Sequence, residues 1–132
     1  MADVNELSER GLRRRKRMLG EAQVDSRMAA AGDFGAPLQH VINAYVYGDV
    51  WERPGLTDDI RSLVMLGMMA ASSKPAEFRV HAKGALANGC TAAQVQDVLL
   101  LVAMYCGVPA AIEPTRIAAE IFGDVADPAA KP

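Results

Sequence analysis

The sequence predicts an all-helical fold, and three observations lead to that prediction. The 132 residues are 51% hydrophobic but only 5% aromatic, so Ala, Leu, Val and Met must supply most of the core. These residues suit close helix packing better than a sheet sandwich, which favours β-branched and aromatic side chains. Helix start and stop signals also recur along the chain. A chain of this length predicts a single domain over residues 1–132, with an ordered core from about residue 6 to residue 123.

We expect about six to seven helices, whose start and stop signals fall at regular intervals. A polar, charged helix covers residues 6–24. Pro37 can open the next helix, because proline is well tolerated at the first helical position. Its apolar residues follow the i, i+3, i+4, i+7, i+8 spacing of a helix face, and they are Leu38, Val41, Ile42, Tyr45 and Val46. The segment 51–55 then forms a loop, since its Pro-Gly pair cannot continue a helix.

Two further helices have clear ends. Thr57 is the expected N-cap of a helix that runs to about residue 71, with Asp58 and Asp59 at the positive end of its dipole. The segment 73–75 interrupts that helix, and Pro75 begins another, which ends at an Asn-Gly pair, residues 88–89.

The last two helices follow from a capping box and a glycine. Thr91 and Gln94 have the spacing of a capping box, which opens a helix to about Cys106. Gly107 ends that helix, and Pro109 begins a final helix to about residue 122. We expect the tail over residues 126–132 to be frayed.

Two segments are apolar on nearly every side of their helices, residues 64–70 and 98–104. One small chain can hardly cover both, so burial between subunits is the economical explanation. Gly67 and Ala103 would let backbones approach closely. The sequence therefore predicts an oligomer.

Charge and cysteine content exclude several classes of function. The net charge of −2 argues against a nucleic-acid partner. The basic run 13–17 is surrounded by acidic residues, and we interpret it as a solvated helix face. We expect no secretory signal, because the start of the sequence has no charged n-region followed by an apolar stretch. We expect no membrane partner, because the longest apolar stretch is too short to span a bilayer. Cys90 and Cys106 lie 16 apart without a CxxC motif, which favours free thiols in the cytoplasm. Two histidines and two separated cysteines also predict no metal site.

Glu77 and His81 are the strongest candidates for chemistry. They lie four residues apart on one predicted helix, so their side chains share a face. A carboxylate beside an imidazole holds its tautomer and suits proton transfer, although the same spacing also describes a surface pair. Arg53 and Arg61 can bind carboxylates with their forked donors.

Two aromatic residues are also candidates. Trp51 is the only tryptophan in the chain, and it lies in the expected loop. Tyr105 has a hydroxyl that can donate a hydrogen bond to a substrate, although buried tyrosines usually do so for structural reasons.

Several stretches, taken in order, resemble the carboxymuconolactone decarboxylase family. They cover roughly residues 10–122, nearly the whole chain, and no single one is decisive. The stretches are residues 17–20 (RMLG) with 24–25 (VD), 48–56 (GDVWERPGL), 61–64 (RSLV), 77–81 (EFxxH), 85–91 (ALANGCT), 98–100 (VLL) and 105–110 (YCGVPA).

The resemblance implies an alkylhydroperoxidase-D-like helical fold, assembled as a homotrimer or homohexamer. It also implies decarboxylation of γ-carboxymuconolactone to β-ketoadipate enol-lactone in protocatechuate degradation, so the expected partner is a small lactone carboxylate. No cofactor is expected, because the lactone conjugated to the breaking bond accepts the electron pair itself. In this reading His81 is the general acid and Glu77 orients it. Trp51, Arg53, Arg61 and Tyr105 are the expected substrate-binding residues.

The chain departs from the family pattern at five positions, and we expect these to affect which anion the site accepts. Tyr47 and Asp49 stand where the family has Trp and Glu, Gln23 replaces a common histidine, and Asp58 and Asp59 replace basic residues.

Three alternatives remain open beside this decarboxylase. One is a related lyase or isomerase acting on another small lactone or carboxylic acid, and another is a non-enzymatic scaffold. The third is a thiol antioxidant, which needs a CxxC before the histidine, where this chain has Lys74 and Glu77.

Overall fold

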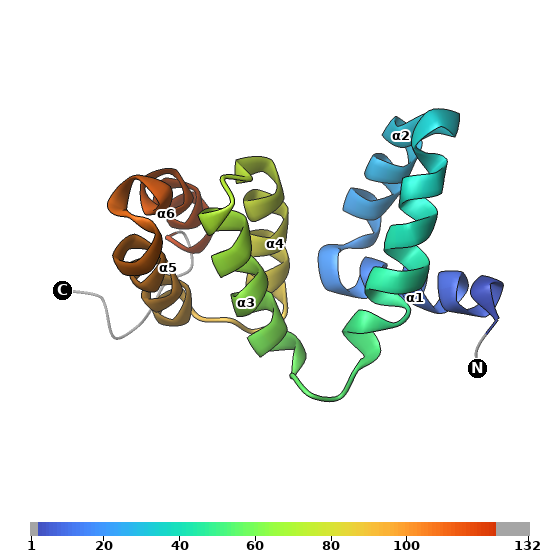
Figure 1. Cartoon of the computed structure of the whole chain (residues 1–132), viewed down its shortest axis with the longest axis horizontal. Helices are drawn as coiled ribbons and strands as arrows, with labels where there is room; N and C mark the ends of the chain where they lie inside the picture. Colours follow the sequence, from blue (N-terminus) through green and yellow to red (C-terminus); the bar gives the residue numbers. More distant parts are fainter. Residues whose placement is uncertain (1–2, 124–132) are drawn as a thin grey trace. The chain divides into compact units, whose positions relative to one another are not determined.

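A computed structural model describes residues 3–123, and within that range the chain forms helices and turns without a strand (Figure 1). The all-α prediction is confirmed, with six α-helices over these residues. The chain divides into two compact units, Met1–Leu56 and Thr57–Pro132, called here the N-terminal unit and the C-terminal unit. The single domain and the oligomer stay predictions.

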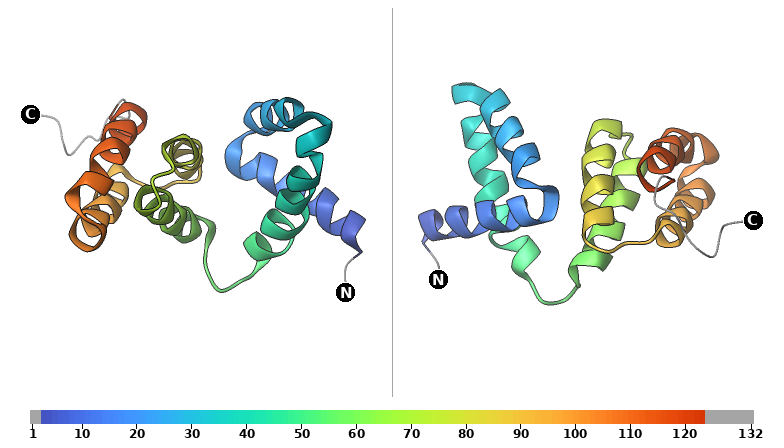
Figure 2. Two further views of the ribbon diagram at one scale, coloured as in Figure 1. Left: turned by 45° about the horizontal axis from the view of Figure 1, so that its top comes forward. Right: turned by 180° about the vertical axis from the view of Figure 1, so that it is seen from behind.

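The N-terminal unit is a pair of helices followed by two short irregular turns, seen from two more sides in Figure 2. Its elements are α1 (Val4–Leu19), α2 (Glu21–Val41), the π-helical segment η1 (Ile42–Tyr47) and the 3₁₀ turn η2 (Val50–Glu52). The α1 helix packs against both α2 and η1. The single helix expected over residues 6–24 is wrong. Gly20 takes a φ of 94° and its N–H donates to the carbonyl of Lys16 at 2.8 Å, which ends α1 five residues earlier than expected.

The second helix begins well before Pro37, so that expected start is also wrong. Gly32, at φ 58° and ψ −162°, interrupts the helical geometry inside α2, and Pro37 lies within the stretch that follows. The break therefore comes from the glycine, because only a residue without Cβ enters this backbone region readily.

The apolar stripe expected after Pro37 does not form the buried face. Leu38 and Val41 are 62% and 45% exposed. Asn43, Ala44 and Tyr47 are the buried residues of η1 instead. A π-helix closes its hydrogen bonds from i to i+5, so side chains no longer align at the spacing of an α-helix. The i, i+3, i+4 rule fails at this segment for that reason.

The basic run 13–17 is only partly a solvated face. Arg15 is 3% exposed, and its Nη1 donates to Gln39 Oε1 at 2.8 Å and to Asn43 Oδ1 at 3.0 Å. Lys16 lies 3.2 Å from the carboxylate of Asp25. Arg13 and Arg17 are exposed, as the sequence indicated. The run therefore serves the packing of α1 as well as its solubility.

The C-terminal unit contains four helices around one apolar core. They are α3 (Asp58–Ala71), α4 (Pro75–Ala87), α5 (Ala92–Cys106) and α6 (Val108–Phe122). Packing joins α3 to α4, α5 to α6, α3 to α5 and α4 to α6. The most deeply buried large side chains of the core are Leu66, Phe78, Val95 and Ile117.

The predicted ends of these helices are confirmed. Thr57 is the N-cap of α3, Pro75 opens α4, and Asn88 is its C-cap. The capping box is complete, because the N–H of Gln94 donates to Thr91 Oγ1 at 3.1 Å and the N–H of Thr91 donates to Gln94 Oε1 at 2.9 Å. The final helix begins at Val108, one residue before the expected Pro109. The expected frayed tail, residues 126–132, lies outside the described residues.

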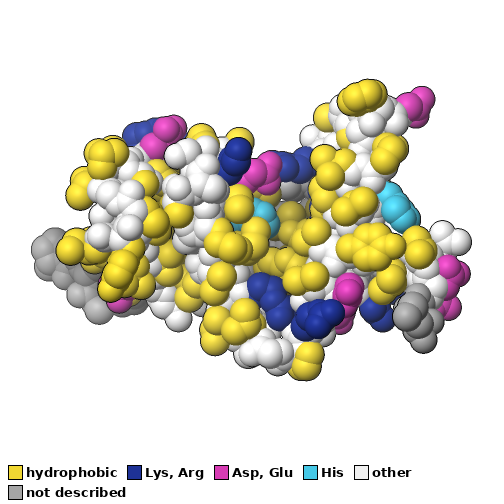
Figure 3. Space-filling model, in the orientation of Figure 1, with side chains coloured by type: hydrophobic (Ala, Val, Ile, Leu, Met, Phe, Trp, Pro, Cys, Tyr) yellow, Lys and Arg dark blue, Asp and Glu magenta, His cyan; other side chains and the backbone are white. Residues whose placement is uncertain are grey.

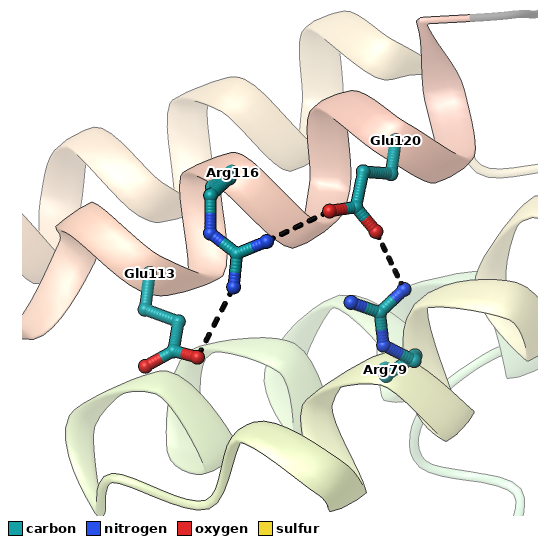
Figure 4. Close-up of polar contacts among 4 residues, drawn as sticks. All are labelled: Arg79, Glu113, Arg116 and Glu120. Carbon is teal, nitrogen blue, oxygen red and sulfur yellow. Dashed lines mark hydrogen bonds and ion pairs between the residues drawn. The ribbon is translucent and has the colours of Figure 1, made fainter.

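Ion pairs join α4 to α6 across the surface of this unit (Figure 4). Glu120 on α6 accepts from Arg79 Nη1 on α4 at 2.8 Å and from Arg116 Nη1 at 2.7 Å. Arg116 also donates to Glu113 at 3.2 Å. Because Arg79 lies between Glu77 and His81 in the chain, this network helps to hold the helix that carries them.

Hydrophobic side chains remain on the surface of the C-terminal unit, as Figure 3 shows for one face. Several belong to the two segments that the sequence marks as apolar all round, including Val64, Met68, Leu100 and Leu101, which are 46–63% exposed. Over the part of the chain that is described, no helix has the length and apolar character needed to cross a membrane.

Candidate functional site

The α4 helix places Glu77 in its first turn and His81 one turn later. Pro75 starts this helix with a pre-set φ, so Glu77 lies near the positive end of the helix dipole. Phe78 and Ala82, the residues that directly follow the pair, are fully buried. Glu77 and His81 each precede one of these buried residues, so their side chains lie beside the core face of the helix and are half-buried. Both side chains are therefore shielded on one side and reachable on the other.

Arg61 lies in the first turns of α3 and is buried, with 8% of its surface exposed. Its Nη1 is 3.8 Å from Asp58 Oδ1. Asp58 is one of the departures from the expected pattern, and it places a carboxylate beside this guanidinium.

Asp59, a second departure, has a local structural role. A hydrogen bond from the side chain of Thr57, and then one from the backbone N–H of Ile60, lower the pKa of Asp59 below its ordinary value. Its carbonyl also accepts from Cys90 Sγ at 3.4 Å. The carboxylate therefore helps to cap α3, which is where acidic side chains are most stabilising.

Trp51 and Arg53 belong to the N-terminal unit, at η2 and directly after it. Trp51 is 3% exposed, and its ring stacks on Tyr47 with centroids 5.3 Å apart and an interplanar angle of 24°. Arg53 has an exposed side chain whose Nε lies 3.6 Å from Asp49 Oδ1. The structure thus brings these two residues together in one turn. It gives Trp51 a packing role and leaves Arg53 accessible.

Tyr105 lies near the end of α5 and is 85% exposed. It contributes to an apolar groove of about 530 Å³ between α3 and α5, which is also lined by Val64, Met68 and Leu101. A second groove of about 720 Å³ lies between α5 and α6. Glu77 and His81 are not among the residues that line either groove. Tyr105 therefore belongs to an apolar groove that neither Glu77 nor His81 lines.

The remaining reactive groups do not assemble into a site. Both cysteines are free, Cys90 buried and Cys106 exposed. Burial raises the pKa of the Cys90 thiol, with a further contribution from Asp59, so this thiol is poorly suited to act as a nucleophile. Among residues 3–123, no three His, Cys, Asp or Glu side chains group closely enough to hold a metal ion.

Sequence reasoning missed the arginines of α1. Arg10 donates to the carbonyl of Gly48 through Nε at 3.1 Å and Nη2 at 2.6 Å, and Arg14 donates to the carbonyl of Trp51 at 2.9 Å. The spacing of these residues could have indicated it. Arg10 and Arg14 are four residues apart and therefore share one face of the helix.

Comparison with known proteins identifies similar sequences. The model of the carboxymuconolactone decarboxylase family matches residues 36–120, which include Trp51, Arg61, Glu77 and His81. The chain is 34% identical to the nitrosuccinic acid decarboxylase of Metarhizium robertsii over 92% of its own length and 85% of that protein. It is 33% identical to the 4-carboxymuconolactone decarboxylase of Acinetobacter baylyi, over 87% of its length and 86% of that protein.

Proposed function

The chain belongs to the carboxymuconolactone decarboxylase family, and from this premise we propose that it is a carboxy-lyase acting on a small organic acid without a cofactor. The observation that carries the proposal is the pair Glu77 and His81. The two residues lie one helical turn apart, both half-buried, inside the segment that matches the family.

The substrate class follows from the chemistry of cofactor-free decarboxylation. When the bond to the carboxylate breaks, CO2 leaves and its electron pair stays on carbon, so the substrate must carry its own acceptor. In γ-carboxymuconolactone the conjugated lactone carbonyl takes the pair as a dienolate. In nitrosuccinic acid a nitro group can take it as a nitronate. Both compounds are small acids with an acceptor near the carboxylate that leaves.

We propose γ-carboxymuconolactone as the first candidate substrate, with β-ketoadipate enol-lactone as its product. The relative that is named for nitrosuccinic acid supports a second candidate, a small nitro acid. Arg53 and Arg61 are the arginines proposed to bind substrate. The departures at Asp49 and Asp58 bear on the choice of substrate, because Asp49 lies 3.6 Å from Arg53 and Asp58 lies 3.8 Å from Arg61.

His81 is the proposed general acid, which donates a proton to carbon and regains one from solvent. In the dienolate of γ-carboxymuconolactone the proton goes to the carbon next to the lactone carbonyl, because the carbon that lost CO2 keeps a double bond in the enol-lactone. In a nitronate the proton goes to the carbon that lost CO2. Glu77 is proposed to orient the imidazole from the preceding turn. Arg61, which is buried with 8% of its surface exposed, is the proposed partner of a substrate carboxylate. A buried guanidinium suits this role, since charge-assisted hydrogen bonds gain strength where water is excluded.

The test is a direct assay of CO2 release from each candidate acid by the purified chain, without added cofactor. His81→Asn should lower kcat by about 10²–10⁴-fold, the usual contribution of a general acid. Glu77→Gln should cause a smaller loss. Lys83→Ala, an exposed change on the same helix, is the control and should keep wild-type turnover. Wild-type turnover in His81→Asn would refute the assigned role, and no CO2 from either acid would refute both substrates.

A further inference from the structure

Three arginines of α1 contact the segment that leads from η1 into η2. Arg10 donates twice to the carbonyl of Gly48, and Arg15 binds the side chain of Asn43 inside η1. Arg14 reaches furthest along the chain, because its Nη2 donates to the carbonyl of Trp51 at 2.9 Å. Hydrogen bonds from a guanidinium are charge-assisted and stronger than those between neutral groups.

Arg14 contacts two consecutive residues of η2. Besides the carbonyl of Trp51, its Nη1 lies 3.9 Å from Glu52 Oε1. The arginine side chain is only 13% exposed, so these contacts are shielded from water to a large extent. The indole of Trp51 is stacked on Tyr47, which holds the same turn from its other end. One ring contact and one guanidinium thus add to the backbone hydrogen bonds that hold η2.

The position of the next residue, Arg53, depends on this turn. Its N–H donates to the carbonyl of Val50 at 3.2 Å, and its backbone is extended at φ −68° and ψ 138°. Its neighbour Glu52 carries a negative charge that Arg14 partly compensates. Loss of Arg14 would release the turn and leave that charge beside Arg53, where it would oppose an anionic ligand.

We propose that Arg14 is a positioning residue, which holds the turn that presents Arg53 to substrate. The proposal rests on the proposed function, because only there does Arg53 bind a substrate. Arg14 acts through the turn and not on the reacting atoms. Its loss should therefore weaken substrate binding and leave the chemical step intact, which appears as a raised KM with kcat retained.

The sole tryptophan of the chain makes the first half of the test independent of activity, because all tryptophan emission comes from Trp51. Arg14→Ala should shift that emission to longer wavelength and increase its quenching by acrylamide. Arg13→Ala, next to it on α1 but exposed, is the matched control and should change neither. Arg14→Lys keeps the charge without the forked donors and should fall between the two, which covers the case in which Arg14→Ala does not fold.

The second half measures KM and kcat for the acid that the wild type decarboxylates. Arg14→Ala should raise KM by about tenfold or more, the equivalent of one lost charge-assisted hydrogen bond, with kcat within about twofold. Unchanged emission and quenching in both Arg14 variants would overturn the positioning role. Altered emission with unchanged KM would overturn its link to substrate. A wild type inactive on both acids would overturn the proposed function and that link, while the fluorescence would still decide whether Arg14 holds the turn.

Discussion

A methyl group added at Gly11 has no room where α1 crosses η1. A Cβ built on Gly11 would coincide with the carbonyl oxygen of Asn43, and it would lie 2.6 Å from the carbonyl carbon of that residue and 2.7 Å from the amide nitrogen of Gly48. All three atoms are backbone, so no rotamer change can move them aside. Gly11→Ala must therefore push α1 away from η1 and stretch the hydrogen bonds that Arg10 and Arg15 make there.

The two opposing effects can be estimated separately. Replacing glycine by alanine inside a helix ordinarily stabilises it by about 1 kcal/mol. Overpacking typically costs about 1–3 kcal/mol, and a clash with rigid backbone on this scale belongs at or above the upper end. We expect Gly11→Ala to lower the free energy of unfolding by a net amount of about 2 kcal/mol or more, a large share of the stability of a small domain.

Urea unfolding followed by Trp51 emission measures this effect in the N-terminal unit. The matched control is Gly67→Ala in α3, where the new Cβ would lie 3.5 Å from Val98 Cγ1, an ordinary contact. Followed by circular dichroism, that variant should be as stable as the wild type or more stable by up to about 1 kcal/mol. A Gly11→Ala protein with wild-type stability would refute the close packing of α1 on η1.

Two further predictions concern the C-terminal unit. Thr91→Ala removes the N-cap oxygen of α5 and should cost about 1 kcal/mol in urea unfolding, and a cost near zero would show that the capping box contributes little. The pKa of Glu120 is lowered from 4.5, chiefly by the hydrogen bond from Arg79. Because the pKa of Glu120 is lower in the folded state than in the unfolded state, its ion pair with Arg79 stabilises the fold above pH 4.5. This stabilisation is lost as the pH falls through the pKa of the folded state. The melting temperature of Glu120→Gln should therefore fall less than that of the wild type below pH 4.5, and parallel profiles for the two proteins would contradict the role of the pair.

The ends of the later helices were predictable because the signals that set them are local. Thr91 and Gln94 satisfy each other's backbone groups within one turn, and Pro75 and Gly107 act through their own φ angles. No distant contact is needed for any of these effects. The same holds for the spacing of Glu77 and His81, which any α-helix would place on one face.

The N-terminal unit was harder to predict because its decisive contacts join distant residues. Arg15 reads as surface charge in sequence, yet it is buried against Gln39 and Asn43, more than twenty residues away. Leu38 and Val41 of the expected stripe lie in α2 and are exposed, and the π-helical turn that follows buries Asn43, Ala44 and Tyr47 instead. The role of Arg14 depends on a carbonyl 37 residues further along the chain.

The sequence by itself determined the helical class, the boundaries of α3 to α6 and the shared face of Glu77 and His81, because caps, prolines and helical periodicity act over a few residues. Only the tertiary structure decided that Arg61 is buried beside Asp58, that Trp51 stacks on Tyr47, and that the arginines of α1 hold the turn before Arg53. These contacts require backbone segments to meet in space. That meeting depends on the packing of whole helices and not on the preferences of neighbouring residues.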